Sequence, residues 1–309
     1  MHANMNILLA GASGQLGREL RPLIEPLGRV VGADRDVLPG DSNTLEQDLA
    51  DRAGVSSLLQ DVQPGLIINA AAYTAVDAAE DDRDTAFLLN AKLPEQLASW
   101  AARHGAWFVH YSTDYVFPGD ATRPYREGDS VAPLNVYGES KQAGEAAVLE
   151  SGCRHLLLRT SWVYSGHGNN FALSMLRLAA ERETLSIVDD QHGCPTWARN
   201  LARVSRDMLD RVLPQSSGDL SGLYHYCDRD AVSWCTFAKT IFDTAKSIGL
   251  LDNVPTVESI TSDEYHQKAK RPAYSVLDAD LARRTFGIEQ PSLRESLETC
   301  LEELKHARR

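Results

Sequence analysis

Short apolar runs alternate with amphipathic segments along the first half of the chain. The runs are almost continuously apolar, which is typical of strands buried on both faces of a parallel sheet. They occupy residues 5–10, 29–34, 65–72, 107–113 and 155–161. The segments between them carry apolar residues at helical spacing, as residues 16–24 do after the first run. Strands that alternate with helices of this length predict βαβ units with right-handed crossovers.

The same pattern predicts how the chain is divided. Helices are expected at residues 53–62, at 77–104 with an interruption at Pro94, and around the sequence NVYGESKQAGE at 135–145. Further along, the pattern loosens into loops rich in Gly, Pro and Asp. We therefore expect an α/β fold with a Rossmann-type, doubly wound parallel sheet in residues 1–164 and a smaller C-terminal substrate-binding cap, mainly residues 165–309. Residues 222–247, which begin with GLYHYC, are expected to return to the first domain.

Composition and charge narrow the function classes. With 43% hydrophobic and 24% charged residues, the chain has the composition of a soluble globular protein, and it has no apolar run of the roughly 18 residues that a membrane span needs. The net charge of −12 argues against binding to nucleic acid, which needs a basic face. The five cysteines are scattered and contain no C-x-x-C. A disulfide framework or a zinc site is therefore not expected, and we predict a cytoplasmic location.

A glycine-rich turn follows the first predicted strand. The sequence GASGQLG places Gly11, Gly14 and Gly17 between that strand and a helix. Glycines in this position let the backbone approach a pyrophosphate, which the helix N-terminus then stabilises. Three glycines alone also fit a purely structural turn, but the strand–turn–helix context favours a dinucleotide site.

The end of the second strand gives conflicting information on which dinucleotide binds. Asp34 is placed to accept hydrogen bonds from an adenosine ribose, which favours NAD. Arg35 follows immediately and is placed to pair with the 2′-phosphate of NADP. Both residues could also be solvated loop charges. We expect NADPH or NADH as the cofactor.

Three polar side chains are expected to meet at the carboxyl edge of the sheet. Tyr137 and Lys141 are four residues apart and share a helix face, as many incidental surface pairs do. Thr113 ends the fifth strand, in the sequence YSTDYVFPG, and ligands of open parallel sheets bind at strand carboxyl ends. Thr, Tyr and Lys from adjacent elements can converge on one carbonyl group. We expect the Lys141 cation to lower the pKa of Tyr137 and so make the phenol a better acid.

Six motifs together carry a family resemblance. They are GASGQLG, NAAAYTAVDAAE, YSTDYVFPG, PLNVYGESKQAGE, RTSWVYSGHGNNF and DDQHGCPT. The first and fourth are typical of the extended branch of the short-chain dehydrogenase/reductase superfamily. The whole set resembles the dTDP-4-dehydrorhamnose reductase family, strongly over residues 5–200 and loosely beyond. The resemblance implies reduction of the C4 ketone of dTDP-4-dehydro-β-L-rhamnose to dTDP-β-L-rhamnose, for cell-surface polysaccharide.

The resemblance also implies residue roles. Tyr137 would donate the proton, Lys141 would assist it and hold the nicotinamide ribose, and Thr113 would bond the substrate carbonyl. The residues implied to hold the deoxysugar are Asp114, Tyr115 and Trp162, and those implied to contact the dinucleotide are Gly14, Gln15, Leu16, Asp48, Leu49, Ala72, Tyr73 and Thr74. Arg271, in the sequence KRPAYSVLD, could neutralise the substrate diphosphate or be a structural residue.

The sequence says less about whether magnesium binds and about which partners the chain has. Some relatives hold magnesium with glutamates at a dimer contact, and Glu19 fits one of those positions. Arg199 stands where such relatives carry another glutamate, so no metal is expected and the associated homodimer is in doubt. The expected partner is a dTDP-sugar, with no nucleic acid and no membrane. Two alternatives remain: a related nucleotide-sugar reductase or epimerase, and a non-catalytic regulatory subunit of methionine adenosyltransferase.

Overall fold

Seven parallel strands form the central sheet. The structure, a computed structural model, describes residues 5–214 and 220–307. The strands of the sheet are β1 (Asn6–Ala10), β2 (Arg29–Asp34), β3 (Thr44–Glu46), β4 (Leu66–Asn69), β5 (Trp107–Thr113), β6 (Arg154–Thr160) and β11 (Gly222–His225). Their order is β11-β6-β5-β4-β1-β2-β3, and each neighbouring pair is parallel. The expected Rossmann-type sheet is therefore confirmed.

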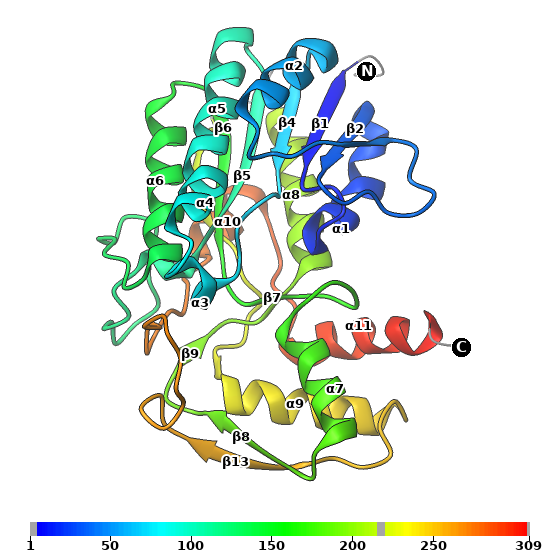
Figure 1. Cartoon of the computed structure of the whole chain (residues 1–309), viewed down its shortest axis with the longest axis vertical. Helices are drawn as coiled ribbons and strands as arrows, with labels where there is room; N and C mark the ends of the chain where they lie inside the picture. Colours follow the sequence, from blue (N-terminus) through cyan, green and yellow to red (C-terminus); the bar gives the residue numbers. More distant parts are fainter. Residues whose placement is uncertain (1–4, 215–219, 308–309) are drawn as a thin grey trace.

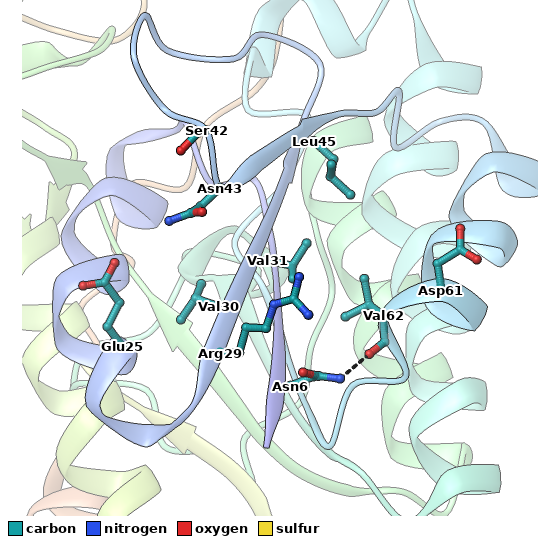
Figure 2. A pocket seen from close by; sticks show the side chains of 10 residues that line it. All are labelled: Asn6, Glu25, Arg29, Val30, Val31, Ser42, Asn43, Leu45, Asp61 and Val62. Atoms are coloured by element: carbon teal, nitrogen blue, oxygen red, sulfur yellow. Dashed lines mark hydrogen bonds between the residues drawn. The ribbon is translucent and has the colours of Figure 1, made fainter. Parts of the chain in front are cut away.

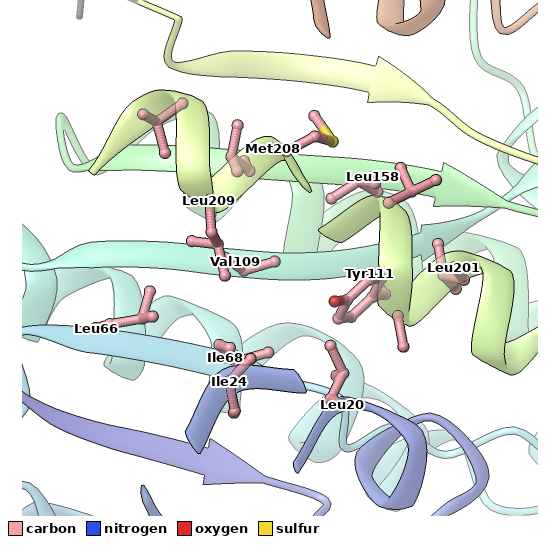
Figure 3. Close-up of a cluster of buried hydrophobic side chains, with 14 of the residues drawn as sticks. Leu20, Ile24, Leu66, Ile68, Val109, Tyr111, Leu158, Leu201, Met208 and Leu209 are labelled. Carbon is pink, nitrogen blue, oxygen red and sulfur yellow. The ribbon is translucent and has the colours of Figure 1, made fainter. Parts of the chain in front are cut away.

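Helices cover both faces of the sheet (Figure 1). On one face lie α1 (Gln15–Ile24) and α8 (Ala198–Val212), joined in the same core by α10 (Asp280–Phe286). On the other face lie α2 (Arg52–Val62), α5 (Leu93–His104) and α6 (Val136–Glu150). Figure 3 shows how Leu20 and Ile24 of α1 and Met208 and Leu209 of α8 pack over the strands. Because both faces are covered, the strands are apolar throughout, as the sequence indicated.

The helical region before β5 differs from expectation. It begins with α3 (Val76–Ala79) and α4 (Arg83–Phe87), and a π-helical turn, Leu88–Lys92, then runs directly into α5. The helix is therefore not interrupted at Pro94, which lies in the first turn of α5. A proline is tolerated there because the preceding widened turn already lacks the regular i→i−4 hydrogen bonds of an α-helix. Its missing N–H and its ring therefore disturb none of them.

A second, smaller group of elements lies below the sheet in Figure 1. It contains α7 (Phe171–Glu181), β8 (Thr184–Val188), α9 (Trp234–Ser247), β13 (Thr256–Ile260) and α11 (Leu293–Ala307), which share one apolar cluster. Three two-stranded pairs accompany it: β8 with β13, β7 (Val163–Tyr164) with β10 (Thr196–Trp197), and β9 (His192–Gly193) with β12 (Val232–Ser233).

The chain returns to the sheet layer after β7, but not over the whole expected segment. β11 pairs with β6, whereas α9, the second half of residues 222–247, packs in the smaller group. Its apolar face, which includes Phe237 and Ile241, meets α7 and α11 rather than the sheet. The boundary near residue 164 stays a prediction. We propose that α7, β8, α9, β13 and α11 make up the cap.

Candidate active site

The glycine turn adopts a backbone that a larger residue would prevent. Gly11 has φ +78°, in the left-handed region, and its N–H donates to Ala33 O at 2.9 Å. A Cβ on Gly17 would lie 2.1 Å from Gly11 O, so the helix approaches the turn more closely than any side chain would allow. Gly14 is exposed at the N-cap of α1 and leaves that helix end open.

Asp34 and Arg35 have different surroundings. The Asp34 carboxylate accepts a hydrogen bond from Ser13 N at 2.9 Å, which fixes it beside the glycine turn. The Arg35 side chain is 79% exposed and lies 3.6 Å from Asp36. The carboxylate is thus placed at the turn, whereas the guanidinium is free to reorient. This arrangement suits a ribose hydroxyl without blocking a phosphate.

The glycine turn is joined to the loop after β7 by the Gln15 side chain. Gln15 Oε1 accepts hydrogen bonds from Ser165 Oγ at 2.9 Å and Asn170 Nδ2 at 2.8 Å. Leu16, next to it, is half-buried against the sheet core. The expected cofactor segment therefore also contacts the part of the chain that leads into α7.

The other expected cofactor residues follow β3 and β4. Asp48 is exposed and its carboxylate accepts from Ala50 N at 2.9 Å, whereas the Leu49 side chain is buried in the core. Ala72 and Tyr73 are half-buried, and Thr74 is exposed. Leu49 can thus reach a cofactor only through its backbone.

Asn90, which no sequence motif marks, holds two of these segments together. It lies fully buried in the π-helical turn, and its amide bonds both Tyr73 N at 2.8 Å and Tyr73 O at 3.0 Å. It also donates to Ser140 Oγ at 3.0 Å, and that hydroxyl donates to Tyr137 O at 2.7 Å. A single amide therefore connects the segment after β4 to the first turn of α6. An Asn within a helical pattern gives no sequence signal for this role.

Helix α6 carries the expected Tyr and Lys into contact with the end of β5. Its N-cap is Asn135, whose side chain accepts from Gly138 N at 2.8 Å. The Lys141 ammonium is buried and donates to Tyr111 O at 2.5 Å. The Tyr137 phenol is half-buried and hydrogen-bonds with the Thr113 side chain. The structure thus brings Thr113, Tyr137 and Lys141 together.

The pKa shifts at this site differ from the expectation for Tyr137. Burial raises its pKa to about 12; the Thr113 hydrogen bond opposes this and the charge of Asp114 adds to it. Burial likewise lowers the pKa of Lys141 to about 8, against the effect of Glu145. The expected lowering of the Tyr137 pKa by Lys141 is therefore wrong. The reason is that desolvation outweighs the cation, which bonds the Tyr111 carbonyl instead.

Asp114 lies behind Thr113 rather than open to solvent. Only 1% of its surface is exposed, and its carboxylate bonds the hydroxyls of Thr113, Ser161 and Ser275. The last two were not expected from the sequence, since Ser275 is 161 positions away along the chain. Direct contact between Asp114 and a sugar stays a prediction.

Tyr115 and Arg271 extend the site beyond Tyr137. The Tyr115 ring meets the Tyr137 ring edge to face, with centroids 5.9 Å apart. The Arg271 guanidinium interacts with the Tyr115 hydroxyl and pairs with Asp77, with Nη2 and Oδ2 separated by 2.7 Å. It also bonds Gln267. Arg271 is thus beside the site, but a diphosphate would have to compete with Asp77.

Trp162 is placed near the site in a constrained conformation. Its φ of +46° is in the left-handed region, and its indole stacks on Trp234 with centroids 3.5 Å apart and planes 5° apart. A Cβ on Gly193 would lie 2.5 Å from the Trp162 ring, so glycine is needed there. Trp234 covers one face of the ring and Gly193 packs against the ring as well, so the expected sugar wall stays a prediction. No motif in the sequence marks Trp234 for this contact.

One hollow in the surface lies away from this site. It has a volume of about 520 Å³ and is lined by residues such as Asn6, Arg29 and Val62, at the amino ends of β1 and β2 and the end of α2 (Figure 2). The candidate site is at the opposite, carboxyl ends of the strands, where parallel sheets bind ligands. We therefore assign the hollow no part in the chemistry.

Comparisons with known proteins agree with this geometry. Residues 5–306 match the family model described as RmlD substrate binding domain. The chain is 40% identical over 300 residues to the dTDP-4-dehydrorhamnose reductase of Escherichia coli K12, covering 97% of this chain and 98% of that one. The chain belongs to the dTDP-4-dehydrorhamnose reductase family.

Solved structures of dTDP-4-dehydrorhamnose reductases have the same fold. One from Clostridium acetobutylicum matches with a TM-score of 0.86 and 34% identity, covering 97% of this chain and all of that chain (100%). One from Bacillus anthracis, in complex with NADP, matches with a TM-score of 0.84 and 35% identity, covering 97% and 99%. The sequence resemblance to the reductase family is confirmed.

Arg199 lies between Glu19, a candidate magnesium ligand by the family resemblance, and Glu303. Arg199 Nε lies 2.7 Å from Glu19 Oε2, and the same guanidinium bonds Glu303. Among the described residues no group of three His, Cys, Asp or Glu side chains could hold a metal ion. The residues present therefore do not fit a magnesium site. Likewise, no helix of residues 5–214 and 220–307 is long and apolar enough to cross a membrane.

Proposed function

We propose that this chain reduces the C4 ketone of dTDP-4-dehydro-β-L-rhamnose to give dTDP-β-L-rhamnose, the activated sugar for cell-surface polysaccharide. The observation that carries the proposal is the meeting of Thr113, Tyr137 and Lys141 at the carboxyl end of β5, on the same edge of the sheet as the glycine turn. Membership of the reductase family supports the same substrate class, a dTDP-sugar.

The residues present fit a nicotinamide dinucleotide. The glycine turn leaves the N-terminus of α1 open to a pyrophosphate, and the Ser13 hydroxyl beside it is buried without a partner. A bound NADH or NADPH supplies the hydride. Gly11, Gly14 and Gly17 shape the approach, and Asp34 holds a ribose hydroxyl. Gln15, Leu16, Asp48, Leu49, Ala72, Tyr73 and Thr74 are the further proposed contacts.

The protein groups provide the acid and the orientation. Tyr137 donates its phenolic proton to the oxygen that forms at C4, which its raised pKa permits because the phenol is fully protonated at neutral pH. Lys141, held by Tyr111 O, supplies positive charge near the phenolate that results. Thr113 donates to the carbonyl oxygen. Burial of these groups keeps bulk water away from the reacting atoms.

The sugar nucleotide is proposed to lie between the strand ends and the cap. Tyr115 and Trp162 face the deoxysugar, and Asp114 supports them. Arg271 releases Asp77 and pairs with the diphosphate instead. A guanidinium can pair with a phosphate as strongly as with a carboxylate. A homodimer and a cytoplasmic location stay part of the proposal; the five free, buried cysteines are compatible with a reducing compartment.

One assay tests the proposal. The purified protein is given NADH or NADPH and the keto-sugar nucleotide as the sole added substrate, and cofactor oxidation and product are measured together. Oxidation with stoichiometric dTDP-β-L-rhamnose is expected. Oxidation only with another sugar nucleotide would favour a related reductase or epimerase. Tight cofactor binding with no oxidation would favour a regulatory, non-catalytic role.

A further inference from the structure

The Asp114 carboxylate is bonded to hydroxyls on both of its oxygens. Thr113 Oγ1 lies 3.0 Å from Asp114 Oδ1, and Ser161 Oγ lies 3.1 Å from Oδ2. Ser275 Oγ bonds the same Oδ2. Over residues 5–214 and 220–307, no lysine, arginine or histidine forms an ion pair with it. The carboxylate thus links the ends of β5 and β6 to the segment before α10, without a counter-charge.

The number of available hydrogens decides the direction of each bond. A hydroxyl has one hydrogen to donate, and an ionised carboxylate has none. Ser161 Oγ already accepts from Cys194 N at 3.3 Å, so its hydrogen is free for Asp114. Thr113 Oγ1 already accepts from Tyr115 N at 3.2 Å. When Asp114 is ionised, the single Thr113 hydrogen must therefore point to Oδ1 and away from any substrate.

Protonation of Asp114 reverses the bond to Thr113. Oδ2 receives the hydrogens of Ser161 and Ser275, so an added proton belongs on Oδ1. From there it donates to Thr113 Oγ1. Both lone pairs of that oxygen are then occupied, by Asp114 and by Tyr115 N, so the Tyr137 phenol can no longer donate to it. The Thr113 hydrogen and the Tyr137 hydrogen are then both left for a carbonyl oxygen.

We propose that Asp114 is a positioning residue of the reduction, which in its neutral form donates to Thr113 and so leaves the Thr113 hydrogen for the substrate carbonyl. This inference rests on the proposed function. It assigns Asp114 a role through Thr113, in addition to or in place of the direct contact with the sugar that the family resemblance implies.

The surroundings of Asp114 give the role a pH dependence. Burial raises the pKa of Asp114 to about 6, although the hydrogen bonds from Ser275, Thr113 and Ser161 lower it. The titratable groups that interact with its charge are Tyr115, Tyr137 and Cys227, and burial or a neighbouring thiol raises the pKa of each, so all three stay neutral near pH 7. The raised pKa favours the neutral acid below its value. The active form is therefore lost as pH rises through the pKa of Asp114.

Asp114→Asn tests the inference because the neighbouring serine hydroxyls fix the orientation of the new amide. The two serine hydrogens require the amide oxygen on their side, so the amide N–H₂ faces Thr113 and donates permanently. We measure kcat/KM against pH for the wild type and for this variant. The wild type should show a decrease in kcat/KM above a pKa of about 6, and Asp114→Asn should lack that decrease. Its KM for the keto-sugar should stay within about twofold, because ground-state binding is retained.

Ser161→Ala is the matched second variant. It removes one hydrogen bond to the Asp114 carboxylate, and Ser161 is not one of the reacting groups. The Asp114 pKa should therefore rise, and the decrease in kcat/KM should move to higher pH. A merely structural role would lower rates without moving the profile. If the wild type is active and kcat/KM decreases at the same pH in the wild type, Asp114→Asn and Ser161→Ala, this inference alone is overturned. A wild type that never reduces the keto-sugar would overturn both the inference and the proposed function.

Discussion

At the scale of single residues, the site depends on groups whose ordinary properties are changed by burial. Tyr137 keeps its proton at neutral pH because burial raises its pKa to about 12, and Lys141 is a weaker base than in water because its pKa falls to about 8. An acid that must deliver a proton only after hydride arrives benefits from being fully protonated beforehand. The Lys141 charge is then most useful to the phenolate.

Tyr137→Phe should lose most turnover and retain cofactor binding. The substitution removes only the hydroxyl, while the ring keeps its edge-to-face contact with Tyr115. Loss of a positioned proton donor lowers kcat by about 10²–10⁴-fold. Stopped-flow or steady-state assays give kcat, and fluorescence titration gives the NADPH dissociation constant. Near-normal turnover would show that another group donates the proton.

Both NADH and NADPH should be used at similar rates. Asp34 is fixed by Ser13 N and favours a ribose hydroxyl, whereas the exposed Arg35 can turn toward a 2′-phosphate. We expect kcat/KM values within about tenfold, a barrier difference below about 1.4 kcal/mol. Arg35→Ala should weaken NADPH alone, because the side chain supports no other described element. A thousandfold preference in the wild type would mean that one residue dominates.

At the scale of elements, the strands could be predicted and the contacts between distant elements could not. Continuous apolar runs identify β1, β2, β4, β5 and β6 because both sheet faces are covered. The packing of α9 could not be read in this way, since an amphipathic helix does not state which apolar surface it meets. The same holds for Trp234 on Trp162 and for Ser275 on Asp114, which are brought together only by the tertiary fold.

The direction of the Tyr137 pKa shift was missed for a related physical reason. Spacing along α6 places Lys141 on the same helix face, but it says nothing of how much water surrounds either group. Desolvation depends on β5 and Asp114, which the sequence places nearby without specifying their distances. Residue types and strand ends thus identified the site, while its electrostatics required the packed structure.

Asn90→Ala should separate the segment after β4 from α6. It leaves Tyr73 N, Tyr73 O and Ser140 without their amide partner in a buried place. Loss of partners for buried polar groups costs about 1–3 kcal/mol. We expect a lower free energy of unfolding in urea and a weaker affinity for NADPH. Ser99→Ala, at an exposed position of α5, is the control and should change neither. Equal stability of both variants would refute a linking role for Asn90.

At the scale of the whole molecule, a fixed guanidinium joins α1, α8 and α11. Arg199 on α8 lies 2.7 Å from Glu19 of α1 and also bonds Glu303 of α11, so the sheet layer and the cap share one ion-pair network. A divalent cation would need several oxygen ligands in this place. The guanidinium already offsets one of the two negative charges, and its own charge repels a metal ion.

Activity should therefore not depend on magnesium. Hydride transfer to a ketone needs a donor to the carbonyl and an acid, and Thr113 and Tyr137 provide both without a metal. We expect kcat after exhaustive EDTA treatment to equal kcat with added magnesium, and the mass in solution by sedimentation to be the same in both. Turnover that EDTA abolishes and magnesium restores, together with a dimer, would show that the Arg199 network opens to admit a metal.

Arg199→Gln is the informative comparison because it leaves Glu19 and Glu303 without their cation. The buried Glu19 carboxylate then lacks its cation and is repelled by the exposed Glu303 carboxylate, so the variant should have a lower Tm than the wild type. Magnesium should raise the Tm of Arg199→Gln by binding between these acids, and it should leave the wild-type Tm unchanged. A wild-type Tm that rises with magnesium as much as that of the variant would mean that the cation binds elsewhere. The role given to Arg199, a guanidinium in place of a metal ion, would then be wrong.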